Sequence, residues 1–587
     1  MSKTDSTENR RKLAPVFIFI LVIVLIVLIL TISKVIDKYT PTTETMSLDE
    51  YFEISSTETG AVIELNNEIL EERALIKDGK VYLSYSFIHD NINSGFYYDA
   101  NENLLLYTTA TDLISIPSNS SEYTVAKDTQ SEDYTIMFAN TDDAYVAVDF
   151  VEKYSNMQYK IYSEPSRIVI CTSFGDYTSV TASKDTVIRY RGGIKSPILE
   201  EVTAGEAFEV LDNEENWTYV ASETGVMGYI QNSYLNDEET AQRVSDYVEE
   251  EYDHILLDET VNMAWHQVTN EVNNESIAEV LNTTKGVNVI SPTWFYLNDD
   301  EGNIASIASS SYVTYCHQNG VQVWGLVSNL ENEDVDTTSV LTHTSTRTNL
   351  VNQIMAAAIQ YDLDGINVDF EALESEVGDA FIQFIRELSL KCANNDIILS
   401  VDNYVPSEYT AFYERGEQAK FADYVIVMAY DEHYVGSDEG PVASIDFVTE
   451  GISNTIKDGV PENQLILGIP FYTRLWIETP KETDGDDVES ASEDYVSYEL
   501  SSQALGMTAA AALASENGVE MQWLDDEGLY YFEYEKDGLT YKVWLEDVTS
   551  IALKLDKMKE NSLAGAAFWK LGLEDSAVWD TILKYMN

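Results

Sequence analysis

Eight short apolar runs recur along the carboxy-terminal half of the chain, and most of the gaps between them have helical patterns. Short apolar runs that alternate with helices are typical of buried parallel strands. Eight such units over roughly 310 residues predict a (β/α)8 barrel, an α/β fold, across 250–587. An open doubly wound sheet is the alternative, but no glycine-rich phosphate loop follows the first run. The runs are 262–268, 286–295, 321–329, 364–371, 397–404, 424–431, 465–472 and 565–572.

The gap between the seventh and eighth runs is too long for one helix. It contains an acidic stretch, DGDDVESASED at 484–494, and apparent hairpin strands, GLYYFEYEKDGLTYKVWLED at 528–547. Alternating apolar and polar residues joined by a turn predict two paired strands. We therefore expect a small α+β insertion on the barrel rim, at about 477–550.

The fourth run, DGINVDFE, places polar residues where a buried strand normally has apolar ones. Because side chains alternate along a strand, Asn367, Asp369 and Glu371 should share the face opposite to Ile366 and Val368. The apolar face can pack on helices, so the polar face points into the barrel and ends at its mouth. Two carboxylates at positions i and i+2 lie about 7 Å apart, and each disfavours ionisation of the other. One of them therefore keeps its proton near neutral pH and can act as a general acid.

The spacing also restricts the mechanism. An ordinary retaining glycosidase needs its second carboxylate on the opposite face of the sugar, whereas Asp369 and Glu371 project from one strand. A substrate with a 2-acetamido group can supply its own carbonyl oxygen as the nucleophile, which is the substrate-assisted exception. The strand thus points to amino-sugar chemistry if the chain is a glycosidase.

Motifs in the predicted barrel strands resemble those of a known family. DGINVDFE at 364–371 is similar to the DGxDxDxE signature of glycoside hydrolase family 18, and MAYD at 428–431 and FWKLG at 568–572 fall in the order of that family's later strand motifs. PFYTRLW at 470–476 looks like the bacterial branch that includes spore-cortex lytic N-acetylglucosaminidases. The resemblance covers about 250–587.

The resemblance implies a role for each matching residue. Glu371 would protonate the glycosidic oxygen, and Asp369 would hold the acetamido N–H. Tyr430 would donate its hydroxyl to the acetamido oxygen, and Trp569 would form the floor of a sugar subsite. No metal or organic cofactor is implied. Further contacts to the sugar or to the polar strand are expected from Asn367, Asp431, Tyr472 and Arg474.

One position departs from the family pattern. The family's middle aspartate is Asn367 here, and an amide cannot store a proton as a carboxylic acid can. Asp369 must then be tuned by another group. We expect a changed pH profile, and activity is retained because the acid itself is present.

The first residues predict a membrane anchor. LAPVFIFILVIVLIVLILTIS at 13–33 has no charge and is long enough to cross a bilayer, which takes roughly 20 residues. Arg10, Arg11 and Lys12 precede it, so residues 1–12 should be cytoplasmic and the chain after Lys38 extracellular. No small-x-small cleavage site follows, so an uncleaved, single-pass anchor in the cell membrane is favoured over a signal peptide.

Two further regions separate this segment from the barrel. Within 48–175, residues 81–107 align with 144–170 as a strand, a short helix and two strands, and this α+β repeat resembles the stalk-like repeats named after the N-terminal domain of copper amine oxidase. Residues 178–236 show short strands punctuated by glycine and resemble a bacterial SH3-like barrel. In that family such modules often bind cell-wall peptides, which would make peptidoglycan a partner.

Charge limits the partners further. The chain has 587 residues and a formal net charge of −68, which repels phosphates, so nucleic acid binding is not expected. The leading hypothesis is a membrane-anchored hydrolase of β-1,4-linked, N-acetylglucosamine-containing glycans such as peptidoglycan or chitin. The alternative is a non-hydrolytic carbohydrate-binding or scaffold protein on the same fold.

Overall fold

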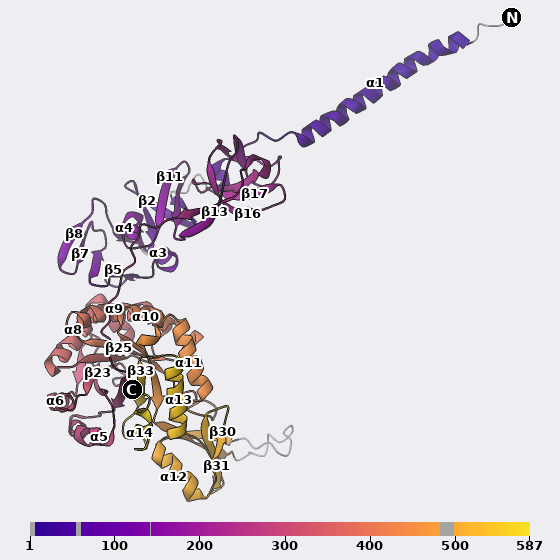
Figure 1. The fold of residues 1–587 in the computed structure, drawn as a ribbon. Helices are drawn as coiled ribbons and strands as arrows, with labels where there is room; N and C mark the ends of the chain where they lie inside the picture. Colours follow the sequence, from indigo (N-terminus) through magenta and orange to yellow (C-terminus); the bar gives the residue numbers. More distant parts are fainter. Residues whose placement is uncertain (1–5, 55–59, 141–142, 482–497, 587) are drawn as a thin grey trace. The chain divides into compact units, whose positions relative to one another are not determined.

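The protein is described by a computed structural model that covers residues 6–54, 60–140, 143–481 and 498–586 (Figure 1). The chain divides into two compact units. The first comprises Met1–Ser94 and Tyr134–Glu249, and the second comprises Gly95–Asp133 and Glu250–Asn587. Each unit is described by itself below.

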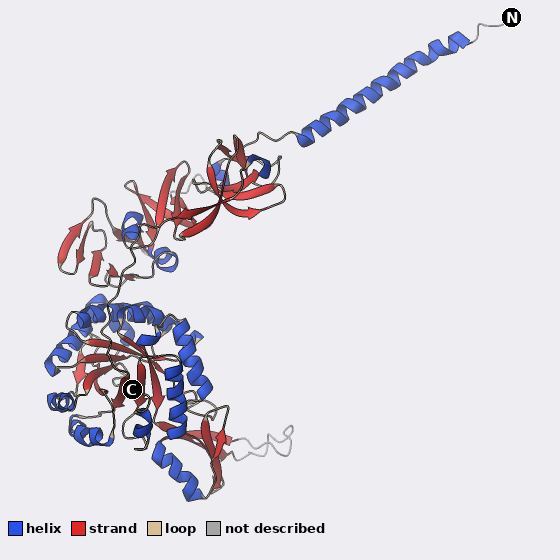
Figure 2. Ribbon diagram, viewed as in Figure 1, coloured by secondary structure: helices blue, strands red, loops and turns tan. Residues whose placement is uncertain are grey.

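The second unit contains a closed ring of parallel strands surrounded by helices (Figure 2). Each strand pairs with its neighbour in register, and pairing of the first two strands closes the ring. All eight strands predicted from the apolar runs are present, so the barrel fold is confirmed. They are β20 (Val261–His266), β21 (Val289–Leu297), β23 (Gln322–Ser328), β24 (Gly365–Asp369), β25 (Ile398–Tyr404), β26 (Tyr424–Met428), β27 (Leu465–Pro470) and β33 (Gly565–Trp569), with β22 (Ile304–Ser306) added antiparallel to β21.

Helices form the outer layer of this ring. Phe381, Phe384 and Leu388 recur at helical spacing on one helix and are fully buried in the same core as Val368 of the fourth strand and Phe370, which follows it. Side-chain caps define where helices begin, as at Ser444, which accepts from the Phe447 N–H at 3.1 Å. The helices are α5 (Ile277–Thr283), α6 (Ser310–Gln318), α7 (Thr337–Thr342), α8 (Thr344–Tyr361), α9 (Gly378–Ala393), α10 (Arg415–Phe421), α11 (Ile445–Lys457), α13 (Val548–Glu560) and α14 (Val578–Ile582).

Large side chains fill the inside of the barrel below the site. Trp265 and Trp324 are buried, with 1% and 0% of their surface exposed. Trp324 stacks on Tyr424 with ring centroids 5.5 Å apart. Met263, Leu326 and other inward-facing residues complete this inner core. The barrel is therefore a packed support, and only the carboxyl ends of the strands are open to chemistry.

The insertion before the last strand forms a sheet of its own with one helix. Its elements are β28 (Tyr472–Pro480), β29 (Tyr498–Gly506), α12 (Met507–Asn517), β30 (Gln522–Leu524), β31 (Leu529–Lys536) and β32 (Leu539–Leu545), in the sheet order β29-β28-β32-β31-β30. Ala510 and Ala514 of the helix pack against Phe532 and Val543 of the sheet. The sheet begins at Tyr472, before the expected boundary at 477, and the acidic stretch 484–494 lies outside the described residues.

A small sheet from the amino-terminal half belongs to the barrel unit. It consists of β4 (Phe96–Asp99), β5 (Leu104–Thr108), β6 (Leu113–Pro117), β7 (Glu122–Val125) and β8 (Asp128–Ser131). Tyr97 and Leu106 share the core that the barrel helices form, and the Gln383 amide of α9 donates to the Thr108 hydroxyl at 3.1 Å. This differs from the expected single region 48–175, because its middle part is buried against the barrel instead.

The first unit is built from two sheets. One has the order β11-β12-β1-β2-β3-β10-β9 and the other β15-β14-β18-β17-β16-β13-β19. The strand–helix–hairpin order is present in both predicted repeats. However, β11 and β12 belong to the first of these sheets, whereas β4 and β5 pair in the separate small sheet of the barrel unit. The likenesses to a stalk repeat and to an SH3-like barrel remain predictions. The elements are α2 (Leu48–Tyr51), β1 (Gly60–Leu65), β2 (Glu68–Lys77), β3 (Lys80–Ser84), α3 (Tyr85–Asn91), β9 (Met137–Ala139), β10 (Ala144–Ala147), α4 (Val148–Lys153), β11 (Gln158–Ser163), β12 (Ser166–Cys171), β13 (Gly175–Thr181), β14 (Thr186–Arg189), β15 (Ile198–Val202), β16 (Ala207–Asn213), β17 (Trp217–Ala221), β18 (Met227–Gln231) and β19 (Glu239–Arg243).

The amino-terminal apolar segment is one long helix, α1 (Ser6–Tyr39). Its part Pro15–Tyr39 is long and apolar enough to cross a membrane, and its most apolar 18-residue stretch has a mean hydropathy of 3.5. A signal sequence would pass the same test. The helix extends beyond the predicted span of 13–33.

Candidate active site

The fourth strand alternates as its sequence predicts. Ile366 and Val368 of β24 are fully buried in the outer core with the helices, and Asn367 points into the barrel. Asp369 follows on the inward face at the carboxyl end of the strand. Glu371 lies two residues further on, in the loop that leaves the strand. The predicted polar series therefore reaches the barrel mouth.

Asn367 is fully buried and its amide is held on both sides. Its Oδ1 accepts from Trp265 Nε1 at 2.9 Å and from the Ser291 hydroxyl at 3.0 Å. Its Nδ2 donates to the Ser400 hydroxyl at 3.1 Å and to Asp402 Oδ1 at 2.8 Å. The expected substrate contact at Asn367 is therefore wrong, because every polar atom of this side chain already has a protein partner.

Asp369 lies above this amide and is electrostatically unfavourable as an anion. Its Oδ1 is buried and accepts no hydrogen bond from any residue that the structure describes. Burial raises the pKa of Asp369 well above its usual value, and the nearby carboxylates of Asp402, Glu371 and Glu331 add to that rise. This carboxyl group therefore binds a proton more readily than an exposed aspartate does.

Glu371 is half-buried and fixed through its backbone. The Glu371 N–H donates to Asn329 Oδ1 and the Asn329 Nδ2 donates back to the Glu371 carbonyl, both at 2.9 Å. Burial raises the pKa of the Glu371 carboxyl group, and the negative charges of Asp431 and Glu331 act in the same direction. A hydrogen bond with the Tyr404 hydroxyl opposes this rise. The side chain is therefore held in place, partly open to solvent and biased toward the protonated form.

Tyr430 follows β26 and lies among these acids. Burial raises the pKa of its hydroxyl well above the usual value, and Asp402, Tyr472, Asp369 and Glu371 raise it further. The phenol therefore stays protonated and can donate a hydrogen bond at any pH at which the protein works. Its ring is edge-on to that of Tyr472, with centroids 6.3 Å apart.

The three other residues that were expected to contact the sugar or the polar strand, Asp431, Tyr472 and Arg474, come together. The Tyr472 hydroxyl donates to Asp431 Oδ1 at 2.6 Å, and Arg474 Nη2 lies 3.8 Å from the same oxygen. Tyr472 and Arg474 belong to β28 of the insertion, whereas Asp431 follows β26 of the barrel. The insertion is thus joined to the barrel mouth at the site, and the Asp431 side chain keeps 47% of its surface exposed.

Trp569 ends the strand β33, which stands four strands away from β24 in either direction around the ring. Its ring is half-buried and lies edge-on to Trp265, with centroids 5.8 Å apart at an interplanar angle of 65°. Trp265 in turn donates to Asn367. An aromatic face is thereby placed across the barrel from the acidic strand.

Three polar residues of the site were not predicted. Asp402 and Tyr404 are on β25, and Asn329 follows β23. Ser400, Asp402 and Tyr404 are spaced two residues apart, which is the same alternation that revealed the fourth strand. The signal was present in the run 397–404 and could have been found there.

His266, the histidine on the first barrel strand, is structural. It is 7% exposed and its Nδ1 lies 2.8 Å from the Tyr312 hydroxyl. Burial, together with the positive charge of Lys570, lowers the pKa of His266 to about 4. The ring is therefore neutral near pH 7. Among the described residues, no group of three or more His, Cys, Asp or Glu side chains is arranged to hold a metal ion.

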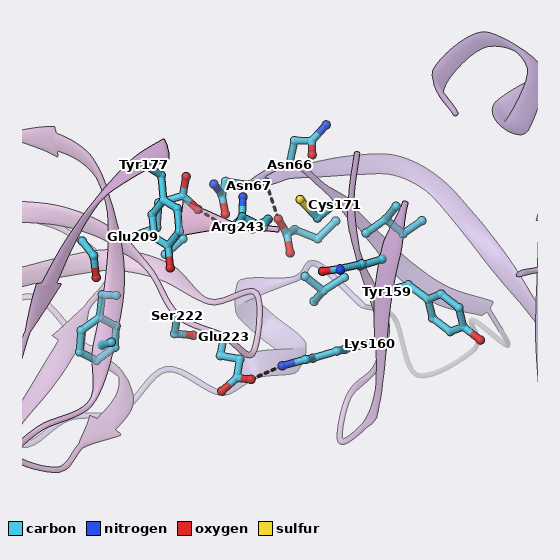
Figure 3. A pocket seen from close by; sticks show the side chains of 18 residues that line it. Asn66, Asn67, Tyr159, Lys160, Cys171, Tyr177, Glu209, Ser222, Glu223 and Arg243 are labelled. Atoms are coloured by element: carbon cyan, nitrogen blue, oxygen red, sulfur yellow. Dashed lines mark hydrogen bonds and ion pairs between the residues drawn. The ribbon is translucent and has the colours of Figure 1, made fainter. Parts of the chain in front are cut away.

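A separate cavity of about 390 Å³ lies in the first unit (Figure 3). Four of its charged side chains form two ion pairs: Arg243 Nη2 lies 2.9 Å from Glu209 Oε2, and Lys160 is turned toward Glu223. Burial raises the pKa of Glu64 in its lining to about 7. None of the residues expected for catalysis lines this cavity, so it is distinct from the barrel site.

Comparisons with known proteins agree with this barrel. Residues 331–574 match the family model of glycosyl hydrolases family 18. A solved carboxy-terminal domain of a Desulfitobacterium hafniense DCB-2 protein, described as a chitinase, has a TM-score of 0.50 at 20% identity, covering 56% of this chain and 100% of that one. At this identity the likeness shows the fold alone.

Two curated relatives are similar in sequence. A Bacillus subtilis (strain 168) protein, described as a sporulation-specific glycosylase, is 28% identical over 249 residues, which are 40% of this chain and 53% of that protein. The cortical fragment-lytic enzyme of Bacillus anthracis is 24% identical over 268 residues, 44% of this chain and 59% of that enzyme. The chain thus spans little more than half the length of either relative. The family match covers residues 331–574, which include the barrel from its fourth strand, β24, through the last, β33, and with them the candidate site.

Proposed function

We propose that the protein is a membrane-anchored, extracellular glycosidase that cleaves β-1,4 linkages in N-acetylglucosamine-containing glycans by substrate-assisted, retaining catalysis. The observation that supports this most is Glu371, a half-buried carboxyl group at the mouth of the barrel whose pKa is raised by burial and by neighbouring acids. A carboxylic acid that keeps its proton near neutral pH can protonate a glycosidic oxygen.

The distribution of acidic groups supports the substrate-assisted route. Asp369, Glu371, Asp402 and Asp431 come from three consecutive strands, β24, β25 and β26, or from the loops that follow them. Trp569 stands on the strand opposite to β24. The acids therefore approach a bound sugar from one side, and the 2-acetamido carbonyl oxygen of the sugar supplies the nucleophile on the other face.

The reaction then has two steps. Glu371 gives its proton to the glycosidic oxygen while the acetamido oxygen bonds to C1 and the C1–O bond breaks, leaving an oxazolinium ion. Asp369 accepts the acetamido N–H, and Tyr430 donates to the acetamido oxygen. Water next attacks C1 from the vacated side as the Glu371 carboxylate takes its proton, which restores the acid and retains the configuration.

The surroundings of the site favour a polymer as substrate. Tyr409 and Tyr434 lie in the loops after β25 and β26, and they are 89% and 55% exposed. Exposed aromatic rings at the carboxyl ends of barrel strands can stack on sugars beyond the one that is cleaved. The names of the curated relatives refer to a sporulation-specific glycosylase and to lysis of cortical fragments. Peptidoglycan is therefore our first choice, and chitin is the second.

The anchor is proposed from the apolar helix. Pro15–Tyr39 is long enough to span a bilayer, and Arg10, Arg11 and Lys12 precede it, which favours a cytoplasmic amino terminus. The barrel would then work outside the cell on the wall. The region 178–236 is proposed to contact wall peptides, as its likeness to SH3-like modules implies.

The test uses the full chain in detergent, with purified peptidoglycan and with chitin oligomers. We expect the release of reducing ends, with a fall of roughly 100- to 10,000-fold in the Glu371→Gln variant, the range that a general acid supplies. The exposed Glu374, three residues away, provides the control variant Glu374→Gln, which should retain activity. If the wild-type chain and Glu371→Gln release equally little while both bind the sugars, the protein is a carbohydrate-binding scaffold and the proposal fails.

A further inference from the structure

Asp402 lies beside Asp369 on the neighbouring strand. In the register of β24 with β25, Asn367 pairs with Ser400 and Val368 with Val401, so Asp369 and Asp402 come next. Neighbouring strands lie about 4.8 Å apart, and paired residues in a parallel sheet point to the same face. Asp402 is 2% exposed, and its Oδ1 accepts from Asn367 Nδ2 at 2.8 Å. The two carboxyl groups are thus neighbours inside the barrel mouth.

We propose, resting on the proposed function, that Asp402 is the positioning residue for Asp369: it shares one proton with Asp369 and takes that proton when Asp369 binds the acetamido N–H. The transfer is balanced, because Asp369–COOH and Asp402–COO⁻ become Asp369–COO⁻ and Asp402–COOH. No external base is needed for this step.

The hydrogen bonds indicate which of the two carboxyl groups carries the proton before substrate binds. Asn367 Oδ1 already has two donors, from Trp265 and Ser291, so its amide is oriented with Nδ2 toward Asp402. Burial raises the pKa of Asp402 as well, and this donor opposes that rise because it stabilises the anion on Asp402. Asp369 Oδ1 is buried and receives no donor from the described residues. A proton on Asp369 removes this unfavourable buried anion, so the resting pair is a protonated Asp369 beside an ionised Asp402.

The charged groups around the pair do not stabilise ionisation of both carboxyl groups. The titratable groups that act on the two carboxyl groups are Glu371 and Glu331 from the loops after β24 and β23, Tyr413 after β25 and Tyr430 after β26. All are acids, and Trp265 from β20 is a neutral donor. Two ionised carboxylates side by side would repel each other in this setting. Asn367, in the position where the family has an aspartate, cannot hold a proton, so the sharing falls to the neighbouring strand.

The shared proton predicts the direction in which the pH profile of kcat shifts when Asp402 is replaced. A pair with one common proton loses its first proton at a lower pH than a single buried carboxyl group and its second at a higher pH. Activity requires the first ionisation only, because Asp402 then accepts the proton of Asp369. In Asp402→Asn the proton must leave Asp369 for solvent, so the acidic limb of the pH profile of kcat moves to higher pH.

The decisive comparison is a double variant that moves the second carboxyl group from position 402 to position 367. In Asn367→Asp/Asp402→Asn the full chain again has two adjacent carboxyls, with donor and acceptor exchanged between positions 367 and 402. We expect the acidic limb to return toward that of the wild type. The control Glu331→Gln removes one exposed acidic charge that acts on Asp369, and it should not reproduce the shift. Unchanged limbs in folded Asp402→Asn, or a shift that the double variant does not reverse, would overturn the proposal.

A second measurement needs no activity, so it separates this inference from the proposed glycosidase function. A carboxyl with a raised pKa keeps a proton in the folded chain that the unfolded chain releases, so its stabilising effect is lost as pH rises through the folded value. The pair holds its last proton to a higher pH than Asp369 alone. Calorimetry of the barrel transition should show Tm falling over a wider range above pH 3.8 in the wild type than in Asp402→Asn. Superimposable curves contradict the sharing even if the chain has no glycosidase activity.

Discussion

At the scale of single residues, the site depends on which hydrogen bond each carboxyl group receives. Asp402 and Glu371 each have a neutral donor, from Asn367 and Tyr404, while Asp369 Oδ1 has none among the described residues. These differences give three neighbouring acids different affinities for a proton. The assignment of acid, proton-sharing and substrate-binding roles follows from them.

Tyr404 provides a test at this scale. Its hydroxyl lowers the pKa of Glu371 by hydrogen bonding to the carboxylate, against the rise caused by burial. Removing the hydroxyl in Tyr404→Phe should raise the pKa of Glu371 further, so the alkaline limb of kcat/KM moves to higher pH. The exposed Tyr409 supplies the control Tyr409→Phe. A limb that moves to lower pH in Tyr404→Phe would contradict the assigned hydrogen bond.

At this scale, the sequence predicted correctly the features that depend on a single strand. Alternation in 364–371 placed Asp369 on the inward face, because a two-residue period is a property of every strand, whereas Glu371 lies beyond the end of β24. It assigned Asn367 to substrate, which the structure contradicts, since burial and four hydrogen bonds depend on residues from three other strands. Asp402 has a similar pattern, but only the register of two strands shows that it stands beside Asp369.

At the scale of elements, the strands were predictable and the partners of surface hairpins were not. The eight barrel strands are apolar runs buried on both faces, so the sequence marks them directly. The hairpin β4–β5 has the same pattern as β11–β12, yet the two bury their apolar faces against different cores. A local pattern shows that a face is apolar and does not identify what covers it.

The contact of this hairpin with α8 gives a stability prediction. The residue before α8, His343, offers the helix no side-chain cap, and Asp99 Oδ2 instead accepts from the Thr344 N–H at 2.6 Å. A negative charge at a helix amino terminus also favours the helix dipole. Asp99→Ala should therefore lower the stability of the barrel by about 1–2 kcal/mol, the usual cost of losing such a cap. Calorimetry measures this, and a Tm equal to that of the wild type would contradict the role.

The loops after the strands give a prediction on substrate length. If Tyr434 stacks on a distant sugar unit, Tyr434→Ala should raise KM severalfold for a long glycan and leave kcat/KM for an N-acetylglucosamine disaccharide substrate nearly unchanged, since one stacking contact is worth about 1 kcal/mol. Tyr498, which is 43% exposed on the insertion, provides a comparison for loss of an exposed tyrosine elsewhere. Equal effects on long and short substrates would argue against an extended binding surface.

At the scale of the whole molecule, the division of the chain differs from its linear order. The barrel unit includes Gly95–Asp133, which interrupts the first unit in sequence. Buried Arg347 is covered in part by this segment, with its guanidinium 4.9 Å from the Tyr97 ring centroid. Sequence spacing alone could not give this arrangement, because it results from long-range packing.

The central claim is that Glu371 supplies the proton that releases the leaving sugar. The most direct measurement compares the wild-type chain with Glu371→Gln on two substrates: an N-acetylglucosamine oligomer and a dinitrophenyl glycoside of the same sugar. A dinitrophenolate leaves without protonation, so the account predicts a large loss of cleavage on the oligomer and a much smaller loss of dinitrophenolate release. Equal losses on both substrates, or no loss on the oligomer, would contradict it.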